Sequence, residues 1–538
     1  MFDAPIADID TKLTLASQRK SAKYSVGFFV ARDALESSQA GRGQSDAIEP
    51  IQSLKELEAR KDGPAHHKTL RAGAIALFSG LGSFLFGLDV GYIGPIIEGD
   101  DFKSSVMHTS SGSNVDSGVE GLIVSSFAIG AIAMVFPIVA SYFVDMWGRK
   151  MSIVLGGLVF IVGGVIQASA FSIAQMIAGR FIAGMSIGLL SSCIVLYQSE
   201  MAPAHLRGAF STLYQLMITF GILIADMVDQ AEVEQENGWR IVISLLCGPA
   251  VALSVGMLYL PQSPRWLVQK GDKDAALKVL LSIRSEQVAH SELEEMTNDY
   301  DAAVAEGKPR WAELFKGKIG WLLLLGVTML LLRQLTGMAA FMYFGPKIFN
   351  GIGLDGDTCA TVNDLINFVA SIPVVFLADS AGRRTLLLCS SVGMALACTV
   401  AGTVGMFTMT LQDDGKWSVS SDEAGWAIAI SVFFFILNFA YGAGPIVWTY
   451  VAEIYPLKYR GRCMAVCTMA HWTGNFIIAE FTPVLLDKVK FGTFFIFAGF
   501  CVVLVVLSAW LPETKGVPLE LVGQLFDQKV GLRHPASS

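Results

Sequence analysis

The chain carries one charged loop twice, first as Asp145-Met-Trp-Gly148-Arg149-Lys150 and again as Asp379-Ser-Ala-Gly382-Arg383-Arg384. Two further pairs of motifs follow in the same order. Glu200, Pro203, Arg207 and Gly208 return at identical offsets as Glu453, Pro456, Arg460 and Gly461, and PQSPR at 261–265 corresponds to PETKG at 512–516. Three motif pairs in one order leave little room for chance, so the sequence predicts two halves related by duplication.

The composition is that of an integral membrane protein. Of the 538 residues, 53% are hydrophobic and only 16% are charged, whereas soluble domains carry about 25% charged residues. The net charge of −8 argues against a nucleic-acid partner, because no basic surface is available to displace counterions. The 8 cysteines stand singly, without the spacing of a disulfide framework or a metal site. We therefore expect no metal and no disulfide scaffold.

The apolar residues gather in runs long enough to cross a membrane, which takes roughly 20 residues as a helix. We count twelve such runs, at 70–97, 119–144, 151–171, 175–199, 209–229, 239–260, 319–348, 358–378, 385–409, 424–452, 461–486 and 490–511. Together with the duplication, they predict an all-α membrane protein of twelve transmembrane helices in two pseudo-symmetric six-helix bundles.

The charges of the loops predict how the helices are oriented. Loops after even-numbered spans are basic, with Arg149, Lys150, Arg207, Arg265, Arg383, Arg384, Arg460 and Arg462, and loops on the other side are mostly acidic. Because basic loops face the cytoplasm, both termini should be cytoplasmic. We expect a partly disordered tail over 1–65 with a short helix near Leu54–Arg60, a bundle over 66–260, cytoplasmic linker helices over 261–318, a second bundle over 319–516 and a tail over 517–538.

These motifs, together with GRFIAG at 179–184 and RQLTG at 333–337, resemble the sugar porter family of the major facilitator superfamily from Leu70 to Leu521. The resemblance implies the major facilitator fold and a transporter without enzymatic activity or cofactor. It implies a monosaccharide cargo, a hexose such as glucose, moved through the lipid bilayer by alternating access. We expect the plasma membrane as its location, and the sequence carries no signal for an oligomer.

A sugar needs amide groups that both donate and accept hydrogen bonds, together with aromatic planes. The resemblance implies that Gln215, Gln334, Asn367, Trp448 and Asn475 line the sugar site, and that the tenth span bends at Gly442 and Gly444. Arg333, Tyr343 and His471 are further candidate contacts. Arg333 and Ala339 depart from the family, which has glutamine and asparagine there. We favour a salt bridge of Arg333 within the bundle; otherwise it contacts the ligand, and an acidic sugar becomes plausible.

An ionisable residue inside the first span points to proton coupling. A charge such as Asp89 costs about 2.5–3.5 kcal/mol at the centre of a membrane helix, so it needs a partner or a function. Arg180 is the obvious partner, and in proton-coupled members of the family the position of Asp89 is the proton site. We predict symport through Asp89 and Arg180. The alternatives are a structural ion pair in a facilitative uniporter, a transporter of a polyol, and a sugar-sensing receptor on the same fold.

The repeated loops supply candidate gate residues at the cytoplasmic surface: Asp145, Arg149, Glu200 and Arg207 in the first half, and Asp379, Arg383, Glu453 and Arg460 in the second. Each ion pair is worth only about 0–1 kcal/mol, which suits a latch between two nearly balanced states. Gln262 stands where the family usually has glutamate, which we expect to weaken the first cluster. The seven histidines form no cluster in the sequence, so we expect no enzyme.

Overall fold

The structure is a computed structural model that describes residues 66–109, 116–135, 139–203, 207–232, 237–305, 310–374, 381–411, 417–419 and 421–515, and residues 307, 377 and 526 singly. The predicted N-terminal tail and its short helix lie outside the described residues, as does the predicted C-terminal tail apart from Phe526. All that follows concerns the described residues.

The described chain is almost entirely helical, and ten of its helical segments are long and apolar enough to cross a membrane. In the first half, the spans are α3 (His66–Ser79) with α4 (Leu81–Glu98), α6 (Ser117–Val135), α7 (Val139–Ala168), α8 (Ile173–Met201), α9 (Arg207–Glu232) and α10 (Gly238–Met257), and α5 (Asp100–Ser105) is a short turn after the first span. Helix α7 contains the end of the second span and the whole third span, which meet at a kink at Gly148.

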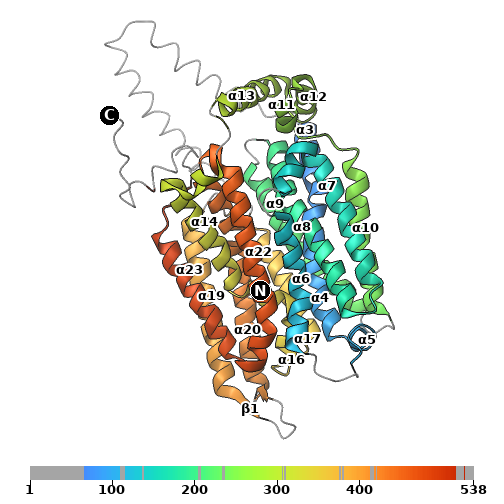
Figure 1. Ribbon diagram of the computed structural model, residues 1–538. Coiled ribbons are helices and arrows are strands. Elements are labelled where there is room, and N and C mark those ends of the chain that lie inside the picture. The colour runs from blue at the N-terminus through green and yellow to red at the C-terminus, as the bar shows by residue number, and fades with distance from the viewer. Residues whose placement is uncertain are drawn as a thin grey trace, which may run out of the picture. The chain divides into compact units, whose positions relative to one another are not determined.

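The second half repeats this order (Figure 1). Its spans are α14 (Gly317–Leu335) with α15 (Met338–Tyr343) and α16 (Gly345–Asn350), α17 (Gly356–Ser371), α19 (Arg383–Thr408), α20 (Asp422–Asn438) with η4 (Phe439–Ala443) and α21 (Gly444–Ile454), α22 (Leu457–Lys488), and α23 (Gly492–Trp510). Helices α17 and α22 hold the places of the eighth and eleventh spans. The predicted fold of twelve helices in two bundles is confirmed.

A small hairpin is the one strand pair in the described part of the chain. Strand β1 (Met409–Leu411) pairs antiparallel with β2 (Trp417–Val419) between α19 and α20. The sequence analysis placed no strand here. Two strands of three residues carry too little alternation to be recognised by pattern.

The linker between the halves folds as α11 (Pro264–Gln269), α12 (Lys273–Ile283), α13 (Glu286–Ala305) and the short 3₁₀ helix η3 (Trp311–Phe315). Arg284 fastens it to the first half: its Nη2 donates to the carbonyl of Ala202 at 2.7 Å, and its Nε donates to Glu292 at 3.1 Å. Lys68 Nζ donates to the carbonyl of Arg284 at 2.9 Å. We call this side of the bundles the linker face, and the opposite side, with α5, α16 and the hairpin, the loop face (Figure 1).

The duplication is visible in the backbone of the two charged loops. Gly148 and Gly382, which occupy equivalent positions in the repeated motif, have φ angles of 80° and 88°. Residues with a Cβ rarely adopt this conformation, so a tight turn of this shape requires glycine. Each turn is followed at once by the next helix of its half. The repeat therefore encodes a shared turn geometry as well as shared charges.

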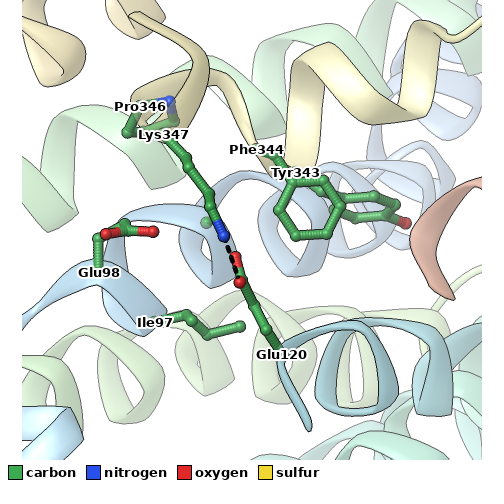
Figure 2. A pocket seen from close by; sticks show the side chains of 8 residues that line it. Ile97, Glu98, Glu120, Tyr343, Phe344, Pro346 and Lys347 are labelled. Carbon is green, nitrogen blue, oxygen red and sulfur yellow. Dashed lines mark hydrogen bonds and ion pairs between the residues drawn. The ribbon is translucent and has the colours of Figure 1, made fainter. Parts of the chain in front are cut away.

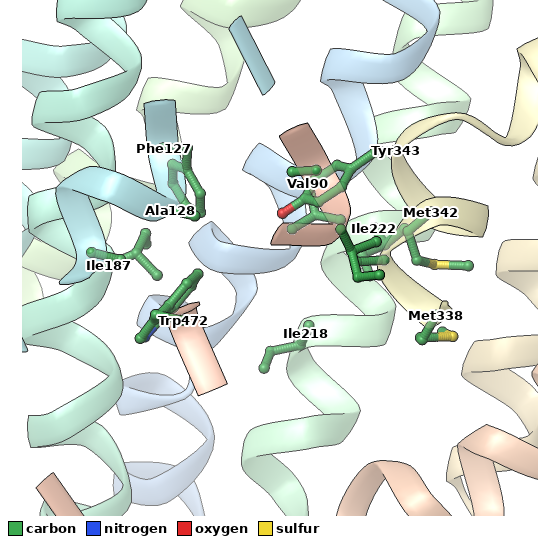
Figure 3. Packing of buried hydrophobic residues seen from close by; sticks show 14 of the residues in the cluster. Val90, Phe127, Ala128, Ile187, Ile218, Ile222, Met338, Met342, Tyr343 and Trp472 are labelled. Atoms are coloured by element: carbon green, nitrogen blue, oxygen red, sulfur yellow. The ribbon is translucent and has the colours of Figure 1, made fainter. Parts of the chain in front are cut away.

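The halves meet around Trp472, which is 1% exposed and lies on α22 of the second half. Its ring centroid is 5.1 Å from that of Phe86 and 5.8 Å from that of Phe127, both in the first half. Figure 3 shows Trp472 beside Phe127, Ala128 and Ile187. Close packing of aromatic rings thus joins the two bundles halfway along their helices.

Candidate functional site

The charged pair predicted in the first half is present and fully enclosed. Asp89 on α4 and Arg180 on α8 are both 0% exposed. Arg180 Nη2 lies 3.3 Å from Asp89 Oδ2, close enough for an ion pair, although neither atom has a partner in hydrogen-bond geometry among the described residues. The guanidinium also stacks against the ring of Phe127, with Cζ 5.5 Å from the centroid. Two opposite charges therefore stabilise each other without filling each other's hydrogen-bonding capacity.

A tyrosine hydroxyl connects this pair to an amide. Tyr92 Oη lies 2.9 Å from Asp89 Oδ1 and 2.6 Å from Gln167 Oε1, and it accepts a bond from Arg180 Nη1 at 3.3 Å. A hydroxyl has one proton, so it cannot donate to both oxygens at once. When Asp89 is ionised, Tyr92 donates to it; when Asp89 is protonated, the carboxyl donates to Tyr92 and Tyr92 donates to Gln167. The cluster can accommodate a proton on Asp89 by reversing one hydrogen bond.

The predicted sugar contacts of the second half come from four different spans. Tyr343 on α15 donates to Asn475 Oδ1 on α22 at 3.2 Å. Asn367 on α17 is 1% exposed, and its Oδ1 is buried without a partner among the described residues. Trp472 Nε1 is likewise buried without a partner. Buried polar atoms normally find partners, so the hydrogen-bonding capacity of these two atoms is unused among the described residues, although Trp472 was not among the predicted contacts.

Arg333, at the end of α14, is surrounded by neutral groups. It is 5% exposed; its Nε donates to the carbonyl of Gly444 at 3.0 Å, and its Nη1 to Gln334 Oε1 at 3.1 Å. The same Nη1 lies 3.4 Å from His471 Nδ1, and the guanidinium is 4.9 Å from the ring centroid of Phe439. No described carboxylate pairs with Arg333. The prediction that Arg333 forms a salt bridge within the bundle is therefore wrong.

The break in the tenth span lies beside this arginine. The segment η4 has π-helical geometry and separates α20 from α21, at the position of Gly442. The amide of Ala443 donates to Ser390 Oγ at 2.9 Å, which gives one backbone donor of the break a partner outside the helix. A helix interrupted in this way presents backbone atoms to the interior of the bundle, where they can bind side chains or ligand.

Aromatic rings form a continuous path between Arg180 and the second half. From Phe127 the path leads to Trp472, then to His471 at 5.4 Å between centroids, and then to Trp448 at 5.0 Å. His471 in turn contacts Arg333. Gln215 on α9 is half-buried and makes no hydrogen bond with a described residue. The structure thus brings His471, Trp448, Arg333 and Gln334 together and leaves Gln215 apart from their hydrogen bonds.

Several contacts tie the halves together near the loop face. Lys347 Nζ on α16 lies 2.5 Å from Glu120 Oε2 on α6, as Figure 2 shows, and Ser125 Oγ donates to Glu480 Oε2 at 2.6 Å. Thr361 on α17 donates to Asp226 on α9, and Gln230 Nε2 donates to the carbonyl of Asp357 at 2.7 Å. Each bond joins a residue of the first half to one of the second. Polar contacts therefore join the two halves near the loop face.

The predicted gate residues form ion pairs within each half at the linker face. Arg149 Nη2 lies 3.0 Å from Glu200 Oε1, and Arg383 Nη2 lies 3.1 Å from Glu453 Oε1. Asp145 is exposed and joins no ion pair with a described residue, although its carbonyl accepts from Trp266 Nε1 at 3.1 Å. Arg460 Nη2 donates to the carbonyl of Tyr455 at 3.1 Å. Asp379 and the side chain of Arg207 lie outside the described residues.

The two motifs that close each half bind the glycine turns directly. Glu513 accepts from the backbone amides of Arg383 at 2.8 Å and Arg384 at 3.0 Å. Gln262, its counterpart, accepts from the amide of Lys150 at 3.1 Å. Two backbone amides of the second turn thus donate to a carboxylate, whereas Gln262 accepts from one amide of the first turn and donates through Nε2 to the carbonyl of Trp147 at 3.4 Å. Glu513 carries a charge that Gln262 lacks, and the weakening of the first cluster stays a prediction.

The sequence matches the family described as "Sugar (and other) transporter" over residues 75–526. It is 33% identical to the hexose transporter HXT10 of Saccharomyces cerevisiae over 470 residues, which cover 85% of each chain. It is 30% identical to the sugar transport protein MST7 of Oryza sativa subsp. japonica, covering 84% of this chain and 90% of the relative. The chain belongs to this family. It is a multi-pass membrane transporter and not an enzyme.

Solved structures place the transporter in the same fold. The E. coli proton:xylose symporter XylE, bound to 6-bromo-6-deoxy-D-glucose, superposes with a TM-score of 0.72 at 23% identity, and the match covers 84% of this chain and 98% of XylE. At this identity the likeness shows the fold, which is that of the major facilitator superfamily. The fold and family expected from the repeated motifs are both confirmed.

Sequence reasoning missed the polar contacts of the loop face and the neighbours of Asp89. Glu120 and Lys347 are 227 positions apart, so no local pattern links them. Two signals could have been noted: the carboxylate of Asp226 within the fifth span and the cation Lys347 near the end of the seventh. Charges are rare at such depths in a membrane. Tyr92 and Gln167 resemble ordinary residues of an apolar helix, and only the hydrogen bond between their side chains, which lie on α4 and α7, reveals them.

Proposed function

We propose that this sugar transporter moves a monosaccharide by alternating access, coupled to a proton carried on Asp89. The observation that carries the proposal is the enclosed cluster of Asp89, Arg180 and Tyr92 beside the aromatic path to the predicted sugar site. The carboxylate has exchangeable hydrogen bonds, which a purely structural ion pair does not need. XylE, which shares the fold, is described as a proton:xylose symporter.

The aromatic path supplies a physical link between proton and sugar. A change of charge on Asp89 alters its electrostatic attraction to Arg180, whose guanidinium contacts the ring of Phe127. Phe127 packs on Trp472, which neighbours His471 and the amides of the sugar site. Coupling through a chain of packed side chains requires two discrete arrangements. The reversible hydrogen bond of Tyr92 provides such a pair of arrangements at the proton end.

The charged contacts supply the alternation. The bonds at the loop face join the halves and hold that side closed, whereas the pairs of Arg149 with Glu200 and of Arg383 with Glu453 lie within single halves. Opening the loop face breaks the contacts between halves and leaves the pairs within each half intact. By the positive-inside rule, we place the linker face in the cytoplasm with both termini, and we assign the transporter to the plasma membrane.

The proposal is tested with purified protein in liposomes and a panel of labelled monosaccharides, neutral and acidic. With one proton per sugar, a pH difference of one unit should support about ten-fold accumulation. Asp89→Asn should abolish that accumulation and leave exchange of labelled for unlabelled sugar intact. Asp274→Asn, which neutralises an exposed carboxylate of the linker helix α12, should change neither.

The other outcomes of this experiment each support one of the alternative functions. Accumulation that survives in Asp89→Asn would overturn the proton assignment. Exchange without accumulation in the unaltered protein would show a facilitative uniporter. A protein that binds sugars without moving any would be a receptor on the transporter fold, and transport would then be wrong.

A further inference from the structure

Arg333 is an exception among the buried arginines of the described chain. Arginines that are at most 6% exposed occur at four described positions, and three of them pair with a carboxylate. Those pairs measure 3.0 to 3.3 Å and are Arg149 with Glu200, Arg180 with Asp89, and Arg284 with Glu292. Arg333 is 5% exposed and contacts the neutral groups of Gly444, Gln334 and His471.

A buried charge without a counterion is costly, so Arg333 calls for an anion from elsewhere. Its hydrogen bonds to described residues use Nε and Nη1. The remaining nitrogen, Nη2, has no bond to a described residue, and it is not enclosed in the way that the unpartnered atoms of Arg149 and Arg180 are. One side of the guanidinium fork is therefore available to a carboxylate.

The guanidinium lies among residues of the predicted sugar site. Gln334 is the adjacent residue of α14 and accepts a hydrogen bond from Nη1. His471 contacts Arg333, and its ring centroid lies 5.0 Å from that of Trp448. At Ala339, which is 6% exposed, the family usually has an asparagine. The site has thus gained a cation and lost an amide. Both changes replace recognition of neutral hydroxyls by recognition of an anion.

The charge of the site favours a monoanion. Among the grouped side chains of Arg333, Gln334, Trp448 and His471, Arg333 is the permanent cation. A phosphate monoester carries about −1.5 to −2 near neutral pH. A single carboxylate matches one guanidinium, both in charge and in the two parallel hydrogen bonds that the pair can form. We propose that the cargo is a sugar acid, a monosaccharide with one carboxylate such as a uronate or an aldonate, which pairs with Arg333. This inference rests on the proposed transport function.

The proposal has an electrical consequence. If Asp89 carries one proton with each cargo molecule, a sugar monoanion makes the transported pair neutral. A neutral sugar with one proton carries one positive charge and is driven by the membrane potential. Uptake of a sugar acid should therefore respond to the pH gradient and be insensitive to an imposed potential.

The test measures uptake of D-glucuronate, D-gluconate, D-glucose and glucose 6-phosphate into proteoliposomes. The unaltered protein should prefer one of the two sugar acids to glucose by about ten-fold or more in kcat/KM, the worth of one charge-assisted hydrogen bond. Arg333→Gln, which restores the residue usual in the family, should lose that preference and gain transport of glucose. Arg333→Lys keeps the charge without the fork and should retain part of the preference.

The outcomes separate the two proposals. Transport of glucose in preference to both acids by the unaltered protein, or an unchanged acid preference in a folded Arg333→Gln protein, would overturn the sugar-acid assignment and leave sugar transport standing. Preference for glucose 6-phosphate would assign the arginine to phosphate instead and also overturn it. Failure to move any of the four compounds would contradict the proposed transport itself. The ratio measured on the unaltered protein decides the matter even if the variants do not fold.

Discussion

The ion pair between Lys347 and Glu120 offers a direct test of what holds the loop face closed. The two side chains are 26% and 4% exposed and lie 2.5 Å apart in different halves. Removing one partner of a fully buried pair costs about 3–5 kcal/mol, because the other charge stays buried alone. Lys347 is partly hydrated, so we discount this to about 2 kcal/mol for Lys347→Gln. The loop-open state is spared this cost because both groups then face water.

A cost of about 2 kcal/mol on one state alone changes the ratio of the two states roughly thirty-fold. We expect Lys347→Gln to shift the protein toward the loop-open state by that order. Spin labels at Phe171 and Phe407, which are 67% and 87% exposed near the loop-face ends of α8 and α19, would report the separation of the halves. Pulsed dipolar spectroscopy of the variant should show a larger population at long distance.

The control is Lys103→Gln, because Lys103 pairs with Glu98 at 3.5 Å within the first half and does not span the halves. It should leave the distance distribution unchanged. Glu120→Gln should shift the ratio less than Lys347→Gln, since the lysine left behind reaches water. The double variant should shift it by less than the sum of the two. Additive shifts, or no shift for Lys347→Gln, would refute the reasoning that this pair holds the face closed.

Two further predictions concern packing and burial. A Cβ on Gly94 would clash with the carbonyl oxygen of Tyr343, whereas a Cβ on Gly73 meets nothing within 4 Å. Gly94→Ala should therefore favour the loop-open state in the same spectroscopic assay, and Gly73→Ala should leave the distances unchanged. Equal effects of the two variants would contradict this prediction. Glu200→Gln should lower the melting temperature more than Glu453→Gln, because the side chain of Arg149, which loses this carboxylate, is 8% exposed and that of Arg383 is 13% exposed. The reverse order in a thermal unfolding assay would show that burial does not rank these pairs.

The sequence predicted the spans well because the hydrocarbon core demands about 20 apolar residues wherever a helix crosses it. It predicted the interruption of the tenth span from Gly442 and Gly444, and η4 lies there. It did not predict that the seventh span divides into α14, α15 and α16. That span carries Gly337 with a φ of 97°, and an isolated glycine in an apolar run is tolerated as often as it breaks a helix.

The candidate site was predicted in part. Asp89 and Arg180 were paired correctly because an isolated charge in a membrane demands a partner, and few charges were available. The same logic failed at Arg333, since a carbonyl, an amide and an imidazole surround it instead of a carboxylate. Whether a buried charge finds its partner within the chain depends on packing between spans, which sequence spacing does not specify.

By itself, the sequence determined the membrane setting, the twelve spans and the duplication, because these follow from local composition and from repeated motifs. The tertiary structure alone decided which residues of the first half contact which residues of the second. The bonds from Lys347 to Glu120 and from Thr361 to Asp226 join residues more than a hundred positions apart. The physical reason is that lipid fixes where each helix must be apolar, whereas only the packing of helices against one another decides which polar groups meet.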